Sequence, residues 1–573
     1  MNRFALPLAA FGVFLACSTA QAQSVGLFQN APESFDGYTL VAPAGATRTH
    51  LIDNCGRIVN QWDSEFRTGE SAYLLEDGSL LRTCRLPSEY FSAGGIGGRV
   101  EKFSWEGEML WSFDIATDTA HHHHDIAPLP NGNVVFLCWE YISPEEAAAA
   151  GRLIEGQLWP PMLVEIEPDG DEGGNVVWEW HAWDHLIQDV DSALPNYGSP
   201  AEHPTRFDVN YGQVSSGGFP GGVSGGDWFH CNAVDYHEEL DQLIVNSRNW
   251  NEFFIIDHGL TSEEAASNAG DLLYRWGNPQ TYGRGTEEDR VFYQQHDAHW
   301  LLGEGPAADS ISDPALTVLV YNNGNGRPSG DGSSVDELIL PWDDVTGSYT
   351  LPPADDLTVP FGPDTLDWMW PELPSMDFHS HNISGSQRQP NGNTLICEGS
   401  KGHLFEITPS GEIVWEYYTA YNQFGPISQG DNPFGNATFR AYRYGPDFAG
   451  FEGRDMTPGD PVEANPYPTN CITYPAPVDT VDTVDTSGTT STLSLEMQIL
   501  IGPNPADDVL FLNSGMDVTW MLTDAAGREI IRGDSPATTH VIETANLPNG
   551  LLLLHLLKKG GAIDAPRRIW IQH

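Results

Sequence analysis

The chain has 573 residues, with 80 acidic against 26 basic side chains and a formal net charge of −54. Such a charge repels nucleic acid and anionic lipid, so neither is an expected partner, and an anionic small molecule must find a local basic pocket. Short apolar runs bounded by glycine and proline are frequent, whereas helical periodicity is scarce. These features indicate an all-β protein that buries a substantial core.

Residues 1–22 have the pattern of a secretory signal peptide, because Arg3 precedes an apolar stretch and residues 20–22 (AQA) form a small-residue cleavage site. Cleavage there removes Cys17 and leaves six cysteines, which are too scattered for a zinc pattern. An oxidising exterior permits disulfides, although the sequence does not give their pairing. No later stretch is long and apolar enough to span a membrane.

A two-part phrase recurs over residues 38–450. One part is an apolar strand, a short turn and a strand that ends in Trp, as in THLIDNCGRIVNQW and HLFEITPSGEIVW. The other begins with a polar residue or histidine and continues through a tight turn into a buried strand, as in HDIAPLPNGNVVFLCWE. Two hairpins per unit, in about six units, predict a six-bladed β-propeller with four strands per blade. A β-sandwich would have similar strands but not this paired phrase.

The composition changes beyond the predicted propeller. Residues 456–494 include PAPVDTVDTVDTSGTTSTLS, which has too few large apolar groups to fold alone, and we expect a disordered linker. Residues 495–573 are expected to form a small β-sandwich-like domain. Its motifs PNPADD, DAAGR and LPNG resemble the C-terminal sorting domain of the bacterial type IX secretion system. The resemblance implies that the type IX machinery exports the protein to the exterior or the cell surface of a Gram-negative bacterium.

Four consecutive histidines, residues 121–124, run directly into a turn and a buried strand. Propeller blades place the starts of their inner strands around a central channel, so residues that open the second phrase converge there. His124, His230, His296 and His381 open this phrase in four units, which predicts a group of histidines at one mouth of the channel. Alignment of the two PNGN turns instead sets His381 opposite His121, so the tetrad offers a histidine at more than one register.

The blade-related histidines favour a shared functional site over isolated structural imidazoles. A metal site is an alternative because imidazole suits zinc, copper or iron. However, no HExxH pair is present and only His379 and His381 lie close together on another element, so we predict no metal. Arg327, in VLVYNNGNGR, adds a planar, bidentate clamp for an oxyanion; a turn arginine that faces water is the alternative.

Taken together, several motifs resemble the bacterial arylsulfate sulfotransferases that need no nucleotide sulfate donor. They are HHHHDIAPLPNGN, DWFHCNAVDY with LIVNSR, QQHDAHW with VYNNGNGR, and SGSQRQPNGNTLICEG with FEITPSGEIVWEYY. The resemblance spans about residues 38–450. It implies a six-bladed propeller that moves a sulfuryl group from an aryl sulfate to a phenol through a sulfohistidine, without a cofactor.

The resemblance also assigns residues. His230, His296 and Arg327 match catalytic positions of the family, and His381 is the match for the nucleophile, with His379 as the alternative. The candidate substrate-binding residues are His121, His124, His379, Asn232 and Asp297. The chain departs from the enterobacterial members in two respects: the propeller is expected to start near residue 38, whereas those members place a separate β-domain, used in dimerisation, before it, and no cysteine lies between Arg327 and His381 for their short-loop disulfide.

The proposed chemistry suits these residue types independently of the resemblance. A neutral imidazole can attack sulfur at neutral pH, and a covalent intermediate splits the transfer into two steps with ping-pong kinetics. Two other functions remain open at this point. One is a sulfatase-like hydrolase in which water is the acceptor, and the other is a non-catalytic secreted propeller that binds glycans or proteins.

Overall fold

The computed structural model describes residues 23–214, 225–301, 316–467 and 471–473, together with the strands of a C-terminal region between residues 500 and 571. The chain divides into two compact units, Met1–Pro477 and Val478–His573. The predicted signal peptide, most of the predicted linker and the PNPADD motif lie outside the described residues.

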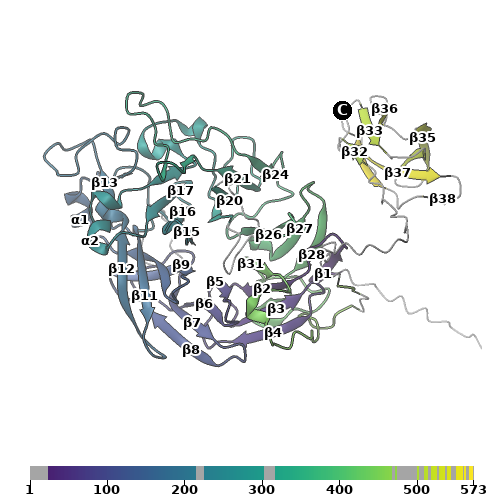
Figure 1. Ribbon diagram of the computed structural model, residues 1–573, viewed down its shortest axis with the longest axis horizontal. Coiled ribbons are helices and arrows are strands. Elements are labelled where there is room, and N and C mark those ends of the chain that lie inside the picture. The colour runs from purple at the N-terminus through teal and green to yellow at the C-terminus, as the bar shows by residue number, and fades with distance from the viewer. Residues whose placement is uncertain are drawn as a thin grey trace, which may run out of the picture. The chain divides into compact units, whose positions relative to one another are not determined.

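The first unit is a six-bladed β-propeller, as the repeated hairpins predict (Figure 1). Each blade is an antiparallel sheet, and its strands are named in order from the channel outward. Blade 1 contains β31 (Thr438–Tyr444), β2 (Tyr38–Pro43), β3 (Arg48–Asp53) and β4 (Ile58–Asp63). Blade 2 contains β5 (Thr68–Leu74), β6 (Leu80–Arg85), β7 (Gly98–Phe103) and β8 (Met109–Asp114). Blade 3 contains β9 (Ala120–Pro128), β10 (Val134–Glu140), β11 (Pro161–Pro168) and β12 (Gly174–His181).

The remaining three blades follow in chain order. Blade 4 contains β15 (Cys231–His237), β16 (Gln242–Ser247), β17 (Glu252–Asp257) and β18 (Tyr274–Trp276). Blade 5 contains β19 (His296–Trp300), β20 (Thr317–Asn322), β21 (Ser334–Ile339) and β24 (Trp368–Trp370). Blade 6 contains β25 (Gly385–Arg388), β26 (Thr394–Glu398), β27 (His403–Ile407) and β28 (Ile413–Tyr418), with β1 (Gly26–Asn30) added outside β28.

Blade 1 closes the propeller because it combines strands from both ends of the unit. β31 pairs with β2 in the register Tyr38↔Tyr444, so a late strand supplies the innermost position of the first blade. The inner strands of neighbouring blades contact one another around the axis. As a result, residues at the same end of the six inner strands are neighbours although they are far apart in sequence.

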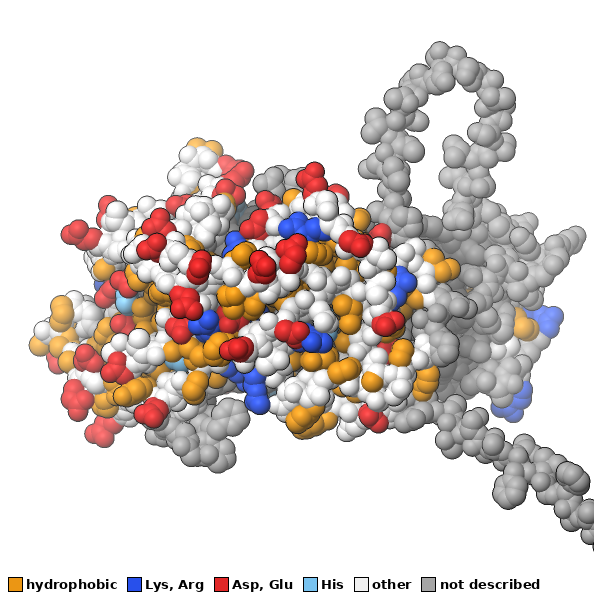
Figure 2. All heavy atoms as spheres, turned by 90° about the horizontal axis from the view of Figure 1, so that it is seen from below, with side chains coloured by type: hydrophobic (Ala, Val, Ile, Leu, Met, Phe, Trp, Pro, Cys, Tyr) orange, Lys and Arg blue, Asp and Glu red, His pale blue; other side chains and the backbone are white. Residues whose placement is uncertain are grey.

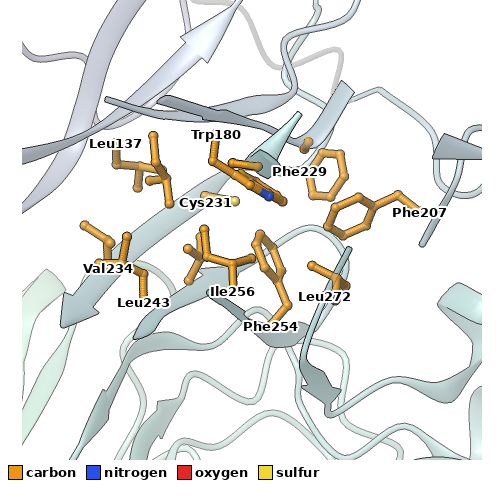
Figure 3. Packing of buried hydrophobic residues seen from close by; sticks show 14 of the residues in the cluster. Leu137, Trp180, Phe207, Phe229, Cys231, Val234, Leu243, Phe254, Ile256 and Leu272 are labelled. Carbon is orange, nitrogen blue, oxygen red and sulfur yellow. The ribbon is translucent and has the colours of Figure 1, made fainter. Parts of the chain in front are cut away.

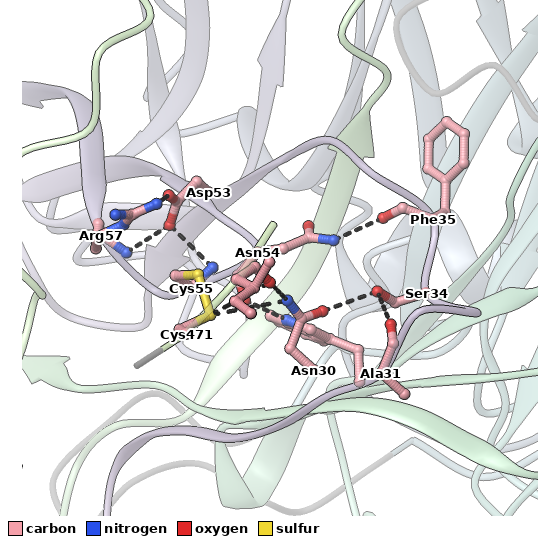
Figure 4. Close-up of a disulfide and its surroundings, with 11 residues drawn as sticks. Asn30, Ala31, Ser34, Phe35, Asp53, Asn54, Cys55, Arg57 and Cys471 are labelled. Carbon is pink, nitrogen blue, oxygen red and sulfur yellow. Dashed lines mark hydrogen bonds and ion pairs between the residues drawn. A yellow bond between two sulfur atoms is a disulfide. The ribbon is translucent and has the colours of Figure 1, made fainter. Parts of the chain in front are cut away.

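A disulfide joins Cys55 to Cys471 across this closure (Figure 4). Cys55 lies in the turn between β3 and β4, where Asp53 Oδ1 accepts hydrogen bonds from the backbone N–H groups of Cys55 and Arg57. Asn30 Nδ2 donates to the carbonyl of Ile472, the residue after Cys471. The bond therefore ties the end of the first unit to blade 1 and supplies the pairing that the sequence left open.

The blades are held together by apolar contacts between adjacent sheets. Figure 3 shows the packing between blades 3 and 4, where Trp180, Phe229 and Phe254 interdigitate with aliphatic side chains, and all three are at most 1 % exposed. Phe207, in the insertion between the two blades, packs edge-on against Phe229 and Phe254. Large buried aromatic groups dominate such a core, which explains the high tryptophan content of the chain.

Helices are few and short in the described residues. They are α1 (Pro144–Ala149), α2 (Ser262–Ala265) and the 3-10 turns η1 (Ala182–His185), η2 (Asn268–Gly270), η3 (Pro279–Tyr282), η4 (Glu287–Asp289), η5 (Gly399–Lys401) and η6 (Ala449–Phe451). Short strand pairs in the insertions are β13 (Leu186–Ile187) with β14 (Phe207–Asp208), β22 (Trp342–Asp343) with β23 (Ser348–Tyr349), and β29 (Tyr421–Asn422) with β30 (Gly425–Pro426). Among the helices described, none has the length and apolar character to cross a membrane. Acidic side chains are spread over the face seen in Figure 2 and outnumber basic ones.

The second unit contains two antiparallel sheets. One has the order β32 (Leu500–Gly502), β33 (Val509–Asn513), β36 (Thr539–Glu543). The other has the order β35 (Glu529–Ser535), β34 (Val518–Asp524), β37 (Gly550–Lys558), β38 (Gly561–Ala562), and β39 (Arg567–Ile571) also pairs with β37. Trp520, Leu522, Ile542 and Leu554 are among its buried side chains.

Candidate functional site

Histidines from three consecutive blades gather at one end of the inner strands. His124 lies on β9, His230 directly precedes β15, and His296 is the first residue of β19. The imidazole centroids of His124 and His230 are 4.8 Å apart. His124 and His296 both flank Phe439 of β31, with centroid distances of 6.0 and 6.4 Å. We refer to His124, His230 and His296 as the histidine cluster.

The backbone at these positions is bent to aim side chains toward the axis. His124 and His230 have φ angles of 54° and 49°, and Asp297, which follows His296, has a φ of 58°. Left-handed conformations are costly for such residues and persist where surrounding structure enforces them, often at functional sites. Each of the three inner strands also pairs with its neighbour through a bulge or register shift near its start, a device that redirects side chains.

The tetrad at residues 121–124 alternates between two faces of β9, so its members have different surroundings. His122 Nδ1 accepts a hydrogen bond from the Gly98 N–H, and its Nε2 donates to the Asp125 carbonyl at 3.2 Å. His123 stacks on Trp139 at 4.1 Å, and its Nδ1 lies 2.8 Å from Nδ1 of His124. The two ring nitrogens of His121 have no hydrogen-bond partner among the described residues.

A glycine-rich segment, residues 94–98 (GGIGG), lies against the tetrad, and no sequence motif pointed to it. The His124 N–H donates to the Gly95 carbonyl at 2.8 Å, and Ile96 forms a β-bridge with His123. A Cβ atom at Gly95 would lie 2.0 Å from Nε2 of His124. This close approach requires glycine, and it fixes the position of the His124 imidazole.

Burial keeps most of these imidazoles neutral at neutral pH. It lowers the pKa of His121 to about 4 and that of His122 to about 3. It also holds the pKa values of His123, His124 and His296 well below the ordinary value, and the positive charge of Arg248 lowers that of His296 further. Neutral imidazoles carry a lone pair, which both nucleophilic and base chemistry require.

His230 differs from the other members of the cluster because a buried carboxylate orients it. Its Nδ1 lies 2.5 Å from Oδ2 of Asp227, which is only 4 % exposed. Donation from Nδ1–H to the carboxylate fixes the tautomer and leaves Nε2 for exchange of a proton with a bound molecule. Asp227 stands in the DWFH motif, so the i, i+3 spacing was a signal available in the sequence.

Beneath the cluster, Arg440 of β31 links the inner strands of several blades. Its guanidinium pairs with Asp125 at 2.7 Å and with Asp297 at 2.9 Å, and it donates to the Asn232 carbonyl at 2.9 Å. The Asn232 side chain is also engaged, since Nδ2 donates to the Gln295 carbonyl. The structure therefore surrounds two predicted substrate-binding residues, Asp297 and Asn232, with partners from the protein itself.

Two asparagines of the NNGNGR turn connect the cluster to the 379–381 segment. Asn323 Oδ1 lies 2.7 Å from Nδ1 of His296, while Asn323 Nδ2 donates to the Ser380 carbonyl at 2.8 Å. Asn325 Oδ1 lies 3.0 Å from Nε2 of His379, and Asn325 Nδ2 donates to the His381 carbonyl at 2.8 Å. The segment that contains both candidate nucleophiles is therefore fastened beside His296.

His379 and His381 are placed differently within that segment. The His379 imidazole is half-buried, and burial lowers its pKa. The His381 side chain is exposed, and its imidazole makes no hydrogen bond to any described residue. His381 thus has the freer ring, and His379 has the ring that Asn325 holds.

Arg327 is half-buried and follows the same turn. Its Nη2 donates to Ser334 Oγ at 3.0 Å, and the guanidinium lies 5.7 Å from the Tyr293 ring centroid. It forms no ion pair with a described carboxylate, and burial lowers its pKa. The described part of the chain contains no set of three His, Cys, Asp or Glu side chains arranged to hold a metal ion.

These observations define a six-bladed propeller with a histidine cluster at one end of its inner strands and with Arg327 on the turn whose Asn323 contacts His296. The chain belongs to the arylsulfotransferase (ASST) family, whose model matches residues 28–337. The matched span includes the histidine cluster and Arg327 and ends before the 379–381 segment. Family membership and fold together support a sulfotransferase-like enzyme that acts on small aryl molecules.

The chain was also compared with curated proteins and with solved structures. No curated protein matches the sequence. A protein of unknown function from Bacteroides caccae is 11 % identical, with a TM-score of 0.36, over 72 % of this chain and 99 % of that one. The β-propeller domain of Cps50 (Swd1) from Myceliophteria thermophila is 10 % identical, with a TM-score of 0.31, over 71 % of this chain and 88 % of its own. The fold assignment itself rests on the six sheets described above.

Proposed function

We propose that the protein transfers a sulfuryl group from an aryl sulfate to a phenol in two steps, through a sulfohistidine at His381. The observation that carries the proposal is the histidine cluster in a chain of the arylsulfotransferase family. His124 and His296, whose burial keeps them neutral, lie with the Asp227-bound His230 at one end of the inner strands. Asn323 and Asn325 hold the segment with the exposed His381 beside His296.

In the first step, a lone pair of the His381 imidazole attacks the sulfur atom. The S–O bond to the aryl group breaks, and the electron pair leaves with the phenolate oxygen. Arg327 stabilises the charge that grows on the sulfuryl oxygens, because its fork-shaped guanidinium matches their geometry. His230, protonated on both ring nitrogens and oriented by Asp227, gives its Nε2 proton to the departing oxygen and is left as the neutral Nδ1–H form.

In the second step, the acceptor phenol takes the place of the departed one. His230 takes back a proton from its hydroxyl group, and the oxygen attacks the sulfur of sulfohistidine. The S–N bond breaks, the lone pair returns to His381, and the new aryl sulfate leaves. Two steps through one site avoid the need to hold both phenols at once, so ping-pong kinetics are expected.

The test uses the purified full chain with 4-nitrophenyl sulfate and a panel of phenols. We expect release of nitrophenolate that depends on the acceptor, together with formation of the acceptor's sulfate ester. Release that does not respond to any phenol would instead identify a hydrolase. Binding without any turnover would identify a non-catalytic propeller.

We also propose that the protein is exported across both membranes of a Gram-negative cell by the type IX machinery. The proposal rests on the signal-peptide pattern of residues 1–22 and on the sorting-domain motifs near the C-terminus, and the Cys55–Cys471 bond suits an oxidising exterior. A mature extracellular species that starts at Gln23 and lacks residues 495–573 would support it. Intact protein retained in the inner membrane would refute it.

A further inference from the structure

Arg248 lies beside His230 of the histidine cluster, although the proposed mechanism gives it no role. It directly follows β16, and its backbone N–H donates to the His230 carbonyl at 3.2 Å. Burial lowers the pKa values of both His296 and Arg248; the positive charge of Arg248 lowers the pKa of His296 further, whereas the Asp227 carboxylate acts to raise the pKa of Arg248. The side chain is partly exposed. The backbone of Arg248 is thus held beside His230, and its guanidinium beside Gln294, two residues before His296.

The charge of Arg248 has no balancing carboxylate in contact. Nη2 donates to Gln294 Oε1 at 2.7 Å and Nη1 to Asn249 Oδ1 at 3.1 Å, and both acceptors are neutral amide oxygens. No ion pair to a described acidic residue accompanies these bonds. In contrast, the buried Arg275 and Arg443 each pair with a glutamate.

Arg152 and Arg284 are also buried without an ion pair to a described carboxylate, but each bonds to at least three backbone carbonyls, whereas the Arg248 guanidinium bonds to two side-chain amides. Acidic residues outnumber basic ones by 80 to 26, so the chain has many carboxylates that could have paired with Arg248. Burial of an unpaired charge is unfavourable, and burial indeed lowers the pKa of Arg248. A guanidinium has five N–H donors, of which protein side chains occupy two in Arg248. The remaining donors suit an anion that arrives from outside.

Gln294 ties Arg248 to the segment of the candidate nucleophile. Its Oε1 accepts from Arg248 and also from Asn325 Nδ2 at 3.0 Å, and Asn325 in turn holds His379 and His381. Gln294 has a φ of 60°, a conformation in which Asn251 helps to hold it through a hydrogen bond to the Gln294 N–H. The orientation of the guanidinium and the position of the segment are thus set by one amide.

We propose that Arg248 binds the sulfuryl oxygens of the aryl sulfate as a second cation in addition to Arg327. The assignment rests on the proposed function and specifies how the enzyme recognises its donor. The preferred donor is a compound whose anionic group is bound by two guanidinium groups. Arg248 discriminates the sulfated aryl molecule from the free phenol, because only the former carries the charge. The phenol acceptor therefore gains nothing from Arg248.

Two variants test this assignment from opposite directions. Arg248→Gln removes the charge. Gln294→Glu leaves Arg248 in place and keeps an oxygen for Asn325, but it gives the guanidinium an internal carboxylate. Arg290→Gln is the matched control, because it removes an arginine four residues from Gln294 whose charge already pairs with Glu287 at 3.4 Å.

Binding is measured by calorimetry with 4-nitrophenyl sulfate, with inorganic sulfate and with unsubstituted phenol, which is neutral at neutral pH, and thermal melts check folding. Both test variants should weaken binding of 4-nitrophenyl sulfate by about 10-fold or more, as expected for the loss of a charged hydrogen bond, and leave phenol binding unchanged. Arg290→Gln should behave as the wild type. Arg248→Lys should fall between, since it keeps the charge without the fork.

The outcomes separate this assignment from the proposed function. Wild-type binding of 4-nitrophenyl sulfate that depends on Arg248, without transfer to any phenol, supports the anion site and refutes the transferase. Transfer with unchanged binding in Arg248→Gln and Gln294→Glu refutes the anion site and leaves the transferase intact. Equal weakening of sulfate and phenol binding would show that Arg248 only positions the 379–381 segment, which also overturns the assignment.

Discussion

Replacement of Gly95 by alanine tests whether the position of the His124 imidazole matters for the reaction. The new Cβ atom would lie 2.0 Å from Nε2 of His124, whereas ordinary van der Waals contact begins near 3.4 Å. The imidazole must therefore move by about 1.4 Å from its place beside His230. A displacement of this size in a reactive site lowers kcat/KM by about 100-fold.

Gly132 provides the matched control for this experiment. Its φ is +89°, close to the +76° of Gly95, and a Cβ atom there meets nothing within 4 Å. Both alanine variants should lose about 1–2 kcal/mol of unfolding free energy from the left-handed backbone, but only Gly95→Ala should lose activity. The assay is acceptor-dependent nitrophenolate release, with unfolding followed by denaturant. Equal activity in the two variants would refute the role given to His124.

Three further predictions concern orientation, cross-linking and protonation. Asp227→Asn should retain the fold but lower kcat/KM by about 100-fold or more and alter its pH profile, because His230 loses the partner that fixes its tautomer; an unchanged profile would contradict this. Replacement of both Cys55 and Cys471 by serine should lower the unfolding free energy by about 2–4 kcal/mol in denaturant titrations. The same double variant should keep wild-type kcat, since β31 separates this turn from the histidine cluster, and a loss of kcat at low temperature would contradict that separation. Burial lowers the pKa of His50 to about 3, so only the unfolded chain gains a proton there as the pH falls from 7 to 5. Over that range the wild type should lose about 2 kcal/mol more stability than His50→Gln, and parallel stability curves would refute the assignment.

The blades were predictable because their signal is local. In blades 1, 2, 3 and 6 the outer hairpin has an apolar strand, a turn residue pattern and a tryptophan in its last strand within one short stretch, as in β27 and β28. The same locality explains why the histidine cluster was expected: once blades are counted, the inner strands define which residues meet. His124, His230 and His296 follow from that geometry without knowledge of any side-chain contact.

The parts that were not predicted depend on pairings between distant residues. β31 enters blade 1 beside β2, and no local pattern indicates that Arg440 will then meet Asp125 and Asp297. The glycine-rich segment of blade 2, residues 94–98, contacts the histidine tetrad of blade 3 through the backbone. Composition alone does not reveal this contact. The sequence does not reveal the ion pair between Asp297 and Arg440. From the sequence alone, the position of Asp297 directly after a histidine therefore indicated a role in substrate binding.

The central claim is a covalent sulfuryl intermediate on a histidine of the channel mouth, and its most direct test is chemical mapping. The full chain is mixed with 4-nitrophenyl sulfate alone, quenched under conditions that preserve an acid-labile label, and digested for tandem mass spectrometry. We predict one added sulfuryl group on His381, absent in His381→Asn and removed by a phenol before the quench. A label on the peptide that contains His121 to His124, or on His379 with His381 unmodified, would contradict the account.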